Sequence, residues 1–161
     1  MASRLKNIAK GVTGVTAAGA LAISLVGGFE GLRLTAYKDI VGIWTACYGE
    51  TKGIKPGMKF SKETCNNMLI DSLVEHEQGM RRCLVNPDKV PVETYIANLS
   101  LTYNIGTGAY CKSTAARKLN AGDIRGNCEA LTMFNKAGGK VVKGLVDRRA
   151  KEKALCLKGL S

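Results

Sequence analysis

Two carboxylates and a hydroxyl occur within sixteen residues of this chain. Glu30 and Asp39 are nine residues apart, and Thr45 follows six residues after Asp39. Cleavage of a glycosidic bond needs such a set. One carboxylic acid protonates the leaving oxygen, while a second carboxylate activates or orients a water molecule on the other face of the sugar. Glu30, Asp39 and Thr45 are therefore the candidate catalytic residues.

The surroundings of each group in the sequence assign the roles. Glu30 is flanked by Phe29 and Leu32 at the edge of an apolar segment. Desolvation there favours the protonated form that a general acid requires. Asp39 stands in a polar turn and is expected to stay ionised, while the hydroxyl of Thr45 can hold a water. Carboxylate pairs at this spacing are common in proteins, so the spacing by itself is a weak indication.

The elements that must position these groups form an α+β pattern. Residues 32–37 alternate as in a strand, 39–42 form a turn, and 43–48 are rich in β-branched and aromatic residues, which together predict a small antiparallel hairpin. Residues 52–59 contain two glycines and a proline and read as a loop. Helices follow this hairpin along the rest of the chain, as in α+β proteins.

The longest predicted helix begins at Ser61, a plausible N-cap, and apolar residues then recur with helical spacing for about five turns. Pro91 suits the first turn of a second helix that reaches to about Asn104, where Gly106 and Gly108 end it. Shorter helices are expected after three capping or breaking residues, Ser113, Asp123 and Gly144.

The N-terminal region has the features of an export segment. Three basic residues, Arg4, Lys6 and Lys10, precede the 19 uncharged residues 11–29. A span of about 20 residues crosses a bilayer, and about 17 suffice. Five glycines, four alanines and three Ser or Thr make this segment weakly apolar. It can be a cleaved signal peptide, a permanent anchor, or a marginal anchor that later leaves the bilayer, and the third fits the composition best. The basic residues predict a cytoplasmic N-terminus and an exported C-terminus.

The net charge of +11 predicts attraction to polyanions such as nucleic acid, anionic lipid or an acidic envelope polymer. Residues 136–158 contain eight basic residues against Asp147 and Glu152, without interleaved aromatic residues or a nucleic-acid-binding motif. We therefore expect an envelope polymer or lipid rather than nucleic acid as the partner. A solvated helix face is the alternative explanation of this charge.

Six cysteines all follow the uncharged segment, and they form neither a CxxC pair nor a cluster with histidine. This pattern argues against a zinc or iron–sulfur site, and we expect neither a metal nor a cofactor. An even number of cysteines in a small exported domain predicts three disulfides, formed in an oxidising compartment.

The longer string around the candidate residues resembles the phage-type lysozymes of glycoside hydrolase family 24, endolysins that cut bacterial peptidoglycan. The resemblance runs from Phe29 to the C-terminus and is carried by residues 30–39, 42–45 and Gly49, with further matches at 103–108, 113–114, 144–149 and Glu152. It implies a lysozyme-like α+β fold, with a small β-hairpin lobe and a mainly helical lobe joined by the long helix.

The resemblance implies a muramidase that hydrolyses the β-1,4 bond between N-acetylmuramic acid and N-acetylglucosamine. Glu30 would be the general acid, and Asp39 and Thr45 would place the water. Such members invert configuration, so the carboxylates should lie roughly 6.5–9.5 Å apart. Tyr103 and Ser113 match positions that line the sugar cleft, although an ordinary packing ring and a helix N-cap explain them equally well.

Two features depart from the soluble members of the family. Many relatives have a histidine where this chain has Glu50. The weakly apolar N-terminus resembles that of the signal-anchor-release subgroup, so we divide the chain into a signal-anchor segment, 1–28, and a catalytic domain, 29–161.

This second resemblance implies export of the chain, as a monomer, by the host secretion machinery. The catalytic domain would lie in the periplasm, tethered to the host inner membrane, and would be inactive until the segment is released. No cysteine precedes Cys47, so reorganisation of the N-terminal helix is the remaining candidate for activation.

The predicted lobes also suggest how the cysteines pair. His76 lies on a helix far from the segment 30–45 and is expected to be a packing residue. The expected disulfides are Cys47–Cys65, Cys83–Cys111 and Cys128–Cys156.

Two other functions stay open on the sequence. A non-enzymatic cationic protein that binds the envelope or disrupts membranes would act without Glu30. A lytic transglycosylase would use one acid and no water, form anhydro-muramic products and tolerate the loss of Asp39. The matching Asp39 and Thr45 argue against the transglycosylase.

Overall fold

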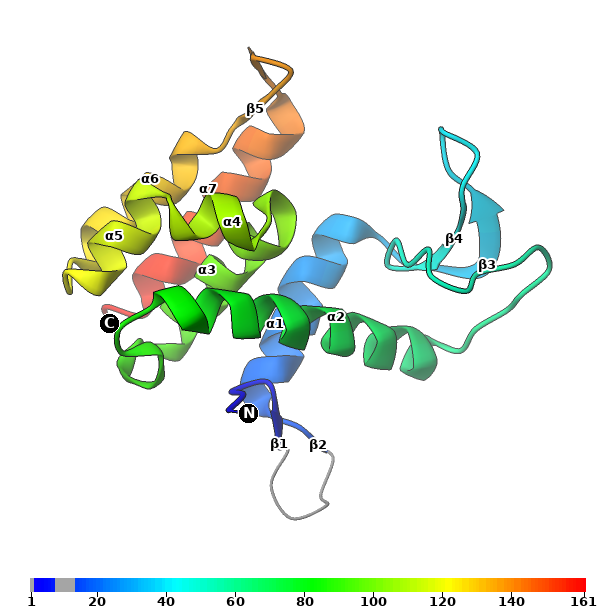
Figure 1. Ribbon diagram of the computed structural model, residues 1–161, viewed down its shortest axis with the longest axis horizontal. Helices are drawn as coiled ribbons and strands as arrows, with labels where there is room; N and C mark the ends of the chain where they lie inside the picture. Colours follow the sequence, from blue (N-terminus) through cyan, green and yellow to red (C-terminus); the bar gives the residue numbers. More distant parts are fainter. Residues whose placement is uncertain (1, 8–13) are drawn as a thin grey trace.

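The computed structural model describes residues 2–7 and 14–161. Figure 1 shows a mainly helical lobe and a small β lobe, with the long helix α2 (Lys62–Cys83) running from one to the other. This arrangement confirms the predicted α+β class and the joining helix.

The small lobe is built on one hairpin. Strand β3 (Arg33–Lys38) pairs antiparallel with β4 (Trp44–Cys47), with Tyr37 opposite Thr45 and Lys38 opposite Trp44. The turn between them contains Gly42 at φ 84°, a left-handed conformation that glycine adopts without steric cost. The predicted hairpin is confirmed, and its register places Asp39 directly after the end of β3.

The joining helix α2 starts as its sequence predicts and, with 22 residues, is about one turn longer than the five turns expected. The Ser61 side chain accepts a hydrogen bond from the backbone N–H of Thr64, which caps the first turn. Arg81 and Arg82 lie in the last turn, where positive charge interacts favourably with the helix dipole. Leu69 and Leu73 belong to its fully buried face.

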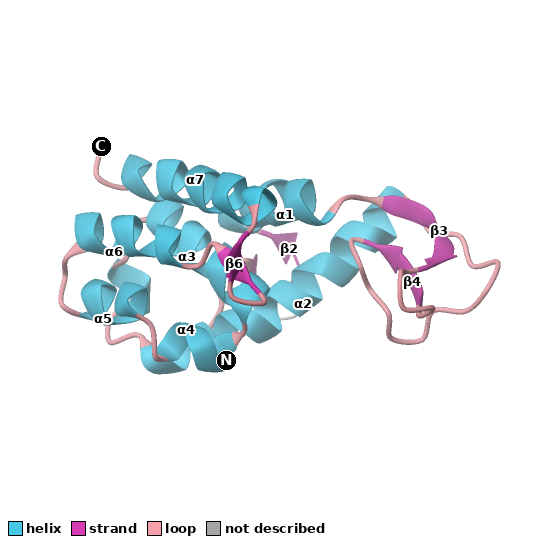
Figure 2. Ribbon diagram, turned by 90° about the horizontal axis from the view of Figure 1, so that it is seen from above, coloured by secondary structure: helices cyan, strands magenta, loops and turns pink. Residues whose placement is uncertain are grey.

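The helical lobe surrounds α3 (Val92–Ile105), whose residues 94–102 are all buried. Because neighbours cover α3 on every side, its sequence lacks a polar face, and buried hydroxyls and amides must find partners within the protein. Figure 2 shows the helices gathered around it. The other elements of this lobe are η2 (Pro87–Lys89), α4 (Thr107–Cys111), α5 (Thr114–Asn120), α6 (Ile124–Ala130), η3 (Leu131–Met133), β5 (Lys136–Ala137), β6 (Lys140–Val141) and α7 (Lys143–Lys158).

Most of the predicted helix ends are confirmed. Ser113 and Asp123 cap α5 and α6 with their side chains, and Gly106 ends α3 at φ 89°. One expectation was wrong: Gly108 lies within the short helix α4 rather than ending a helix. Gly144 lies in the first turn of α7, which begins one residue earlier.

The uncharged N-terminal segment contributes a packed helix to this structure. Helix α1 (Ala17–Glu30) contacts α2 and α3 and buries Ala22 and Val26. The predicted boundary at residues 28 and 29 falls inside this helix and stays a prediction. Residues 11–13 of the predicted segment, and Lys10 before it, lie outside the described residues. In the described part of the chain, no helix is both long and apolar enough to cross a membrane.

Two short strands precede α1 and pair with each other. Strand β1 (Lys6–Asn7) lies antiparallel to β2 (Gly14–Val15), which brings the start of the chain back beside the beginning of α1.

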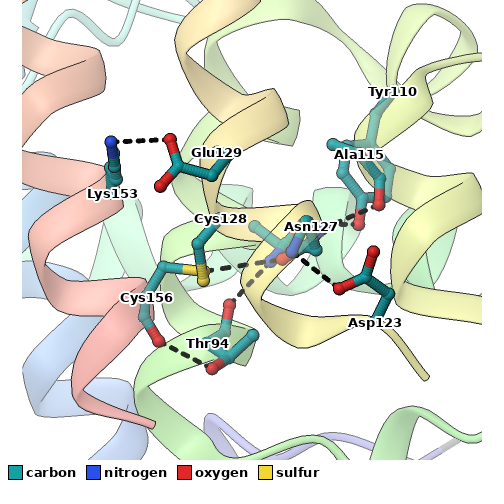
Figure 3. The surroundings of a disulfide bond; sticks show 11 residues. Thr94, Tyr110, Ala115, Asp123, Asn127, Cys128, Glu129, Lys153 and Cys156 are labelled. Carbon is teal, nitrogen blue, oxygen red and sulfur yellow. Dashed lines mark hydrogen bonds and ion pairs between the residues drawn. A yellow bond between two sulfur atoms is a disulfide. The ribbon is translucent and has the colours of Figure 1, made fainter. Parts of the chain in front are cut away.

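All six cysteines form disulfides in the predicted pairing, Cys47–Cys65, Cys83–Cys111 and Cys128–Cys156. Figure 3 shows the third, which joins α6 to α7. Both of its cysteines are fully buried, and the Thr94 hydroxyl of α3 donates a hydrogen bond to the Cys156 carbonyl oxygen at 2.9 Å. The third disulfide therefore holds α6 and α7 together beside the central helix α3.

Replacing both Cys128 and Cys156 with alanine should lower the free energy of unfolding by about 2–4 kcal/mol, because the bond closes a loop with a sequence separation of 28 residues. Urea unfolding under oxidising conditions measures this loss. In the presence of a reductant, the difference between the variant and the parent protein should shrink. Equal midpoints under oxidising conditions would contradict this account.

Candidate active site

Glu30 is the last residue of α1, directly before Gly31 at φ 77°. Its side chain is 27% exposed, and its Oε1 accepts a hydrogen bond from Nη1 of Arg148 at 2.8 Å. Arg148 comes from α7, so the two residues are 118 positions apart in the chain. The candidate acid thus lies where the end of α1 meets α7.

Arg148 is itself held between an aromatic ring and a buried carboxylate. Its guanidinium carbon lies 4.6 Å from the centre of the Phe29 ring, and its Nε lies 3.7 Å from Oε2 of Glu152. Glu152 is fully buried, and it also pairs with Arg149 at 2.5 Å and accepts a hydrogen bond from Ser100. Burial raises the pKa of the Glu152 carboxyl, and the charge of Arg149 opposes that shift. This network fixes the arginine that contacts Glu30.

The sequence predicted apolar surroundings for Glu30, and that prediction was incomplete. Phe29 does lie beside it, but the nearest polar partner is a cation from the other end of the chain. Arg148 lies within the matching segment 144–149 and precedes Glu152 by four residues, one helical turn. That spacing was the available signal for an ion-pair network, and it did not indicate which residue Arg148 would contact.

Asp39 and Thr45 are brought together by the backbone of Ile43. Oδ1 of Asp39 accepts hydrogen bonds from the N–H groups of Val41 at 3.0 Å and Ile43 at 2.8 Å. The Thr45 hydroxyl donates to the carbonyl oxygen of Ile43 at 3.0 Å. Since the hydroxyl hydrogen is used in this bond, the Thr45 oxygen can accept a hydrogen bond from a water. The hairpin therefore fixes both side chains relative to the same residue.

Tyr103 lies within electrostatic range of the candidate acid. Its ring packs against His76 with the centroids 4.8 Å apart, which confirms His76 as a packing residue. Burial raises the pKa of the Tyr103 hydroxyl to about 12, and the charges of Glu50 and Glu30 act in the same direction. Tyr103 is therefore a neutral hydroxyl near Glu30 at physiological pH.

Glu50 adds a carboxylate whose role the sequence did not indicate. Its oxygens accept hydrogen bonds from the Ser72 hydroxyl at 3.3 and 3.4 Å, which connects the small lobe to α2. Burial raises the pKa of the Glu50 carboxyl, the bond from Ser72 opposes this, and Glu75 and Asp71 add to it.

Ser113 is the N-cap of α5. Its hydroxyl donates to the carbonyl oxygen of Tyr110 at 2.6 Å and accepts from the N–H of Ala116 at 3.1 Å. The predicted capping role is confirmed, and contact of Ser113 with a sugar stays a prediction. Over residues 2–7 and 14–161, no group of three or more His, Cys, Asp or Glu side chains could hold a metal ion.

The sequence model of the phage lysozyme family matches residues 27–152, which contain Glu30, Asp39, Thr45, Tyr103 and Ser113. The chain belongs to the phage lysozyme family. It is a lysozyme, and its substrate is bacterial peptidoglycan. The lysozyme-like fold expected from the sequence is confirmed.

Relatives and a solved structure extend this similarity over most of the chain. The SAR-endolysin of Enterobacteria phage P21 is 38% identical over 165 aligned residues, which cover 95% of this chain and 97% of that protein. The SAR-endolysin of Bacteriophage PS119 is 40% identical over 136 residues, 82% of this chain and 78% of that protein. The crystal structure of the active form of P1 phage endolysin Lyz superposes with a TM-score of 0.77 at 25% identity, covering 91% of this chain and 86% of that chain.

Replacing Arg148 with methionine should lower peptidoglycan hydrolysis roughly tenfold or more, because Glu30 loses the group that fixes its position. The free energy of unfolding should fall by about 1–3 kcal/mol, since a hydrogen bond between charged groups is lost. Turbidity loss of cell-wall suspensions and urea unfolding measure the two effects.

The matched control is Arg125→Met on α6, an exposed arginine whose replacement should change neither quantity appreciably. Full activity of the Arg148→Met variant would show that the ion pair does not position the acid.

Proposed function

We propose that this lysozyme is an endolysin that lyses the host cell and is activated by release from the membrane, with Glu30 as general acid and Asp39 and Thr45 placing the attacking water. The observation that carries the proposal is the position of Glu30 as the last residue of α1, the helix formed by the uncharged segment. The catalytic acid and the membrane segment share one element, so the location of that element determines whether the acid is in place.

The geometry supports a division of roles in hydrolysis of the β-1,4 bond between N-acetylmuramic acid and N-acetylglucosamine. Glu30 protonates the leaving oxygen and becomes a carboxylate, which Arg148 at 2.8 Å stabilises. Asp39 and Thr45, both fixed on Ile43, hold a water that attacks from the other face of the sugar. Attack from that face inverts the configuration, so the enzyme is an inverting glycosidase.

Tyr103 and Ser113 belong to the proposed sugar cleft. Tyr103 lies near Glu30 with a half-buried hydroxyl that stays neutral, and a neutral hydroxyl can donate to and accept from sugar hydroxyls. The Ser113 hydroxyl makes both of its hydrogen bonds within the fold. Its part in the proposed cleft is therefore to fix the start of α5.

Release from the membrane is the proposed activating step. In the tethered state, residues 11–29 span the host inner membrane, with the N-terminus in the cytoplasm and the catalytic domain in the periplasm after export by the host secretion machinery. Glu30 then lies at the lipid interface, away from Arg148. The names of the relatives from phages P21 and PS119 support this sequence of events, as does the likeness to an active form of a phage endolysin. The released enzyme is a monomer.

The small residues of the segment support both of its states. They weaken it as a membrane anchor, and in the folded domain they permit close contacts. A Cβ on Gly27 would lie 2.9 Å from the Tyr48 ring, and one on Gly19 would lie even closer to the backbone of Leu5. Larger residues at Gly19 and Gly27 would strengthen the segment as a membrane anchor and would not fit in the domain without a shift of their neighbours.

Replacing Glu30 with glutamine should reduce peptidoglycan hydrolysis by about 100-fold or more, because the amide cannot donate the proton. Folding should survive, as judged by urea unfolding. The release of reducing sugar ends from purified peptidoglycan measures the activity. Glu129→Gln, at an exposed position, is the control and should keep full activity.

Other outcomes identify the other functions. Lysis by Glu30→Gln that depends on the basic residues of 136–158 would favour a cationic membrane-disrupting protein. Anhydro-muramic products and an active Asp39→Asn variant would indicate a transglycosylase.

Proton NMR of the first product formed tests inversion of configuration. An inverting enzyme that cleaves a β-linkage releases the α-anomer, so the α-anomer is expected and a β-anomer would contradict inversion.

Depolarising the membrane of expressing cells should move the protein from the membrane fraction to the soluble periplasmic fraction and bring activity with it. Gly28→Leu should slow this transfer compared with Gly28→Ser, because leucine makes the segment more apolar. A Cβ at Gly28 meets no atom within 4 Å, so both variants should be active once released. Cleavage after residue 28, or a chain that is always soluble, would overturn activation by release and leave the lysozyme assignment intact.

A further inference from the structure

The first described residues of the chain lie against the middle of α2 and bind a buried carboxylate. The hydroxyl of Ser3 donates to Oε1 of Glu77 at 2.5 Å, and the backbone N–H of Arg4 donates to Oε2 at 2.8 Å. Glu77 is fully buried, and its third donor is the Tyr95 hydroxyl at 2.6 Å. Two of its three hydrogen bonds therefore come from the N-terminal residues.

The side chain of Arg4 occupies a site of its own beside Glu77. Its Nη1 donates to the carbonyl oxygens of Pro87 at 3.1 Å and Val90 at 2.6 Å. Its guanidinium carbon lies 4.5 Å from the centre of the Tyr95 ring, in cation–π contact. The loop between α2 and α3 thus recognises a guanidinium, and Tyr95 contacts both Arg4 and Glu77.

Leu5 connects this site to the beginning of α1. Its side chain is fully buried, and its carbonyl oxygen accepts from the N–H of Thr16 at 3.0 Å. The Thr16 hydroxyl donates to the carbonyl oxygen of Arg4 and accepts from the N–H of Gly19, which caps α1. The docked residues and the first turn of α1 therefore form one hydrogen-bonded unit.

An empty site at Glu77 would be costly for the domain. Without residues 3–5, the buried carboxylate keeps the Tyr95 hydroxyl as its donor and loses the two donors from Ser3 and Arg4. In the folded domain, where Glu77 is fully buried with residues 3–5 in place, the loss of two of its three hydrogen-bond donors is destabilising. The folded domain is therefore more stable with this segment in its site.

The proposed tethered state prevents this binding. If residues 11–29 span the bilayer, residues 3–5 lie on the cytoplasmic side, about 30 Å of hydrocarbon away from the domain. We propose that the pocket formed by Glu77, Tyr95 and the carbonyls of Pro87 and Val90 is an intramolecular receptor for Ser3-Arg4-Leu5. It is filled only after release and draws the tethered–released equilibrium toward the active state. A ligand shifts an equilibrium by its differential affinity for the two states, and here the ligand is the chain's own N-terminus.

This inference rests on the proposed release, and it goes beyond release by naming what stabilises the released state. The segment that leaves the membrane is not only repacked as α1. Its first residues also bind a polar site on α2, 73 residues away in the chain.

Two substitutions in the full-length chain test the receptor. Ser3→Ala removes one donor to the carboxylate, and Glu77→Gln removes the buried charge. Neither alters the basic residues at the N-terminus or the uncharged segment. Each should lower the ratio of released to tethered protein after depolarisation by roughly tenfold, and the double variant should fall little further. Glu75→Gln, exposed on the same helix, is the matched control and should leave the ratio unchanged.

The outcomes separate this inference from the proposed function. Equal release of the parent, Ser3→Ala and Glu77→Gln proteins would overturn the receptor and leave anchor release standing. Fully additive losses would also overturn it, because they would show that the two residues act independently. A parent protein that never sediments with membranes would overturn both proposals. The specific activity of the released fraction checks that each variant has folded.

Discussion

The ion pair between Glu30 and Arg148 joins the end of the first long helix to the last helix of the chain. A carboxylate of this kind is useful in catalysis only when its position is fixed, and here a buried arginine fixes it. The arginine is in turn held by Glu152, which is buried and paired with a second arginine. Because this network lies on α7, the proposed catalytic acid on α1 depends on contacts that only a fully assembled helical lobe can provide.

The parts of the fold that could be predicted from the sequence are those with local causes. The hairpin follows from the alternation of residue types along its strands and from the turn that contains Gly42. Helix α2 begins after Ser61 because the Ser61 hydroxyl accepts a hydrogen bond from the backbone N–H three residues later. The cysteine pairs follow the division into lobes. Arg148 beside Glu30 could not be predicted in the same way, since a contact across 118 residues leaves no periodic signal. For the same reason, nothing near Ser3 in the sequence indicated its contact with Glu77.

If residues 11–29 are a membrane anchor before release, as proposed, their glycines and alanines meet two requirements. A membrane segment needs enough apolar surface to insert, whereas a helix at the centre of a small domain needs residues that let its neighbours approach. At Gly19 and Gly27 the domain allows no larger side chain without a shift of its surroundings. In the proposed anchor, the small residues that weaken membrane insertion are thus of the kind that α1 needs at Gly19 and Gly27.

The three disulfides connect the small lobe to α2, α2 to α4, and α6 to α7. None of them includes α1, because all six cysteines lie after it in the sequence. Oxidation can thus complete the covalent frame of the enzyme while its first helix is elsewhere. In the proposed release mechanism, disulfide formation and activation are then separate events: one is thiol oxidation in the oxidising compartment, and the other is the non-covalent docking of α1 onto a scaffold that is already cross-linked.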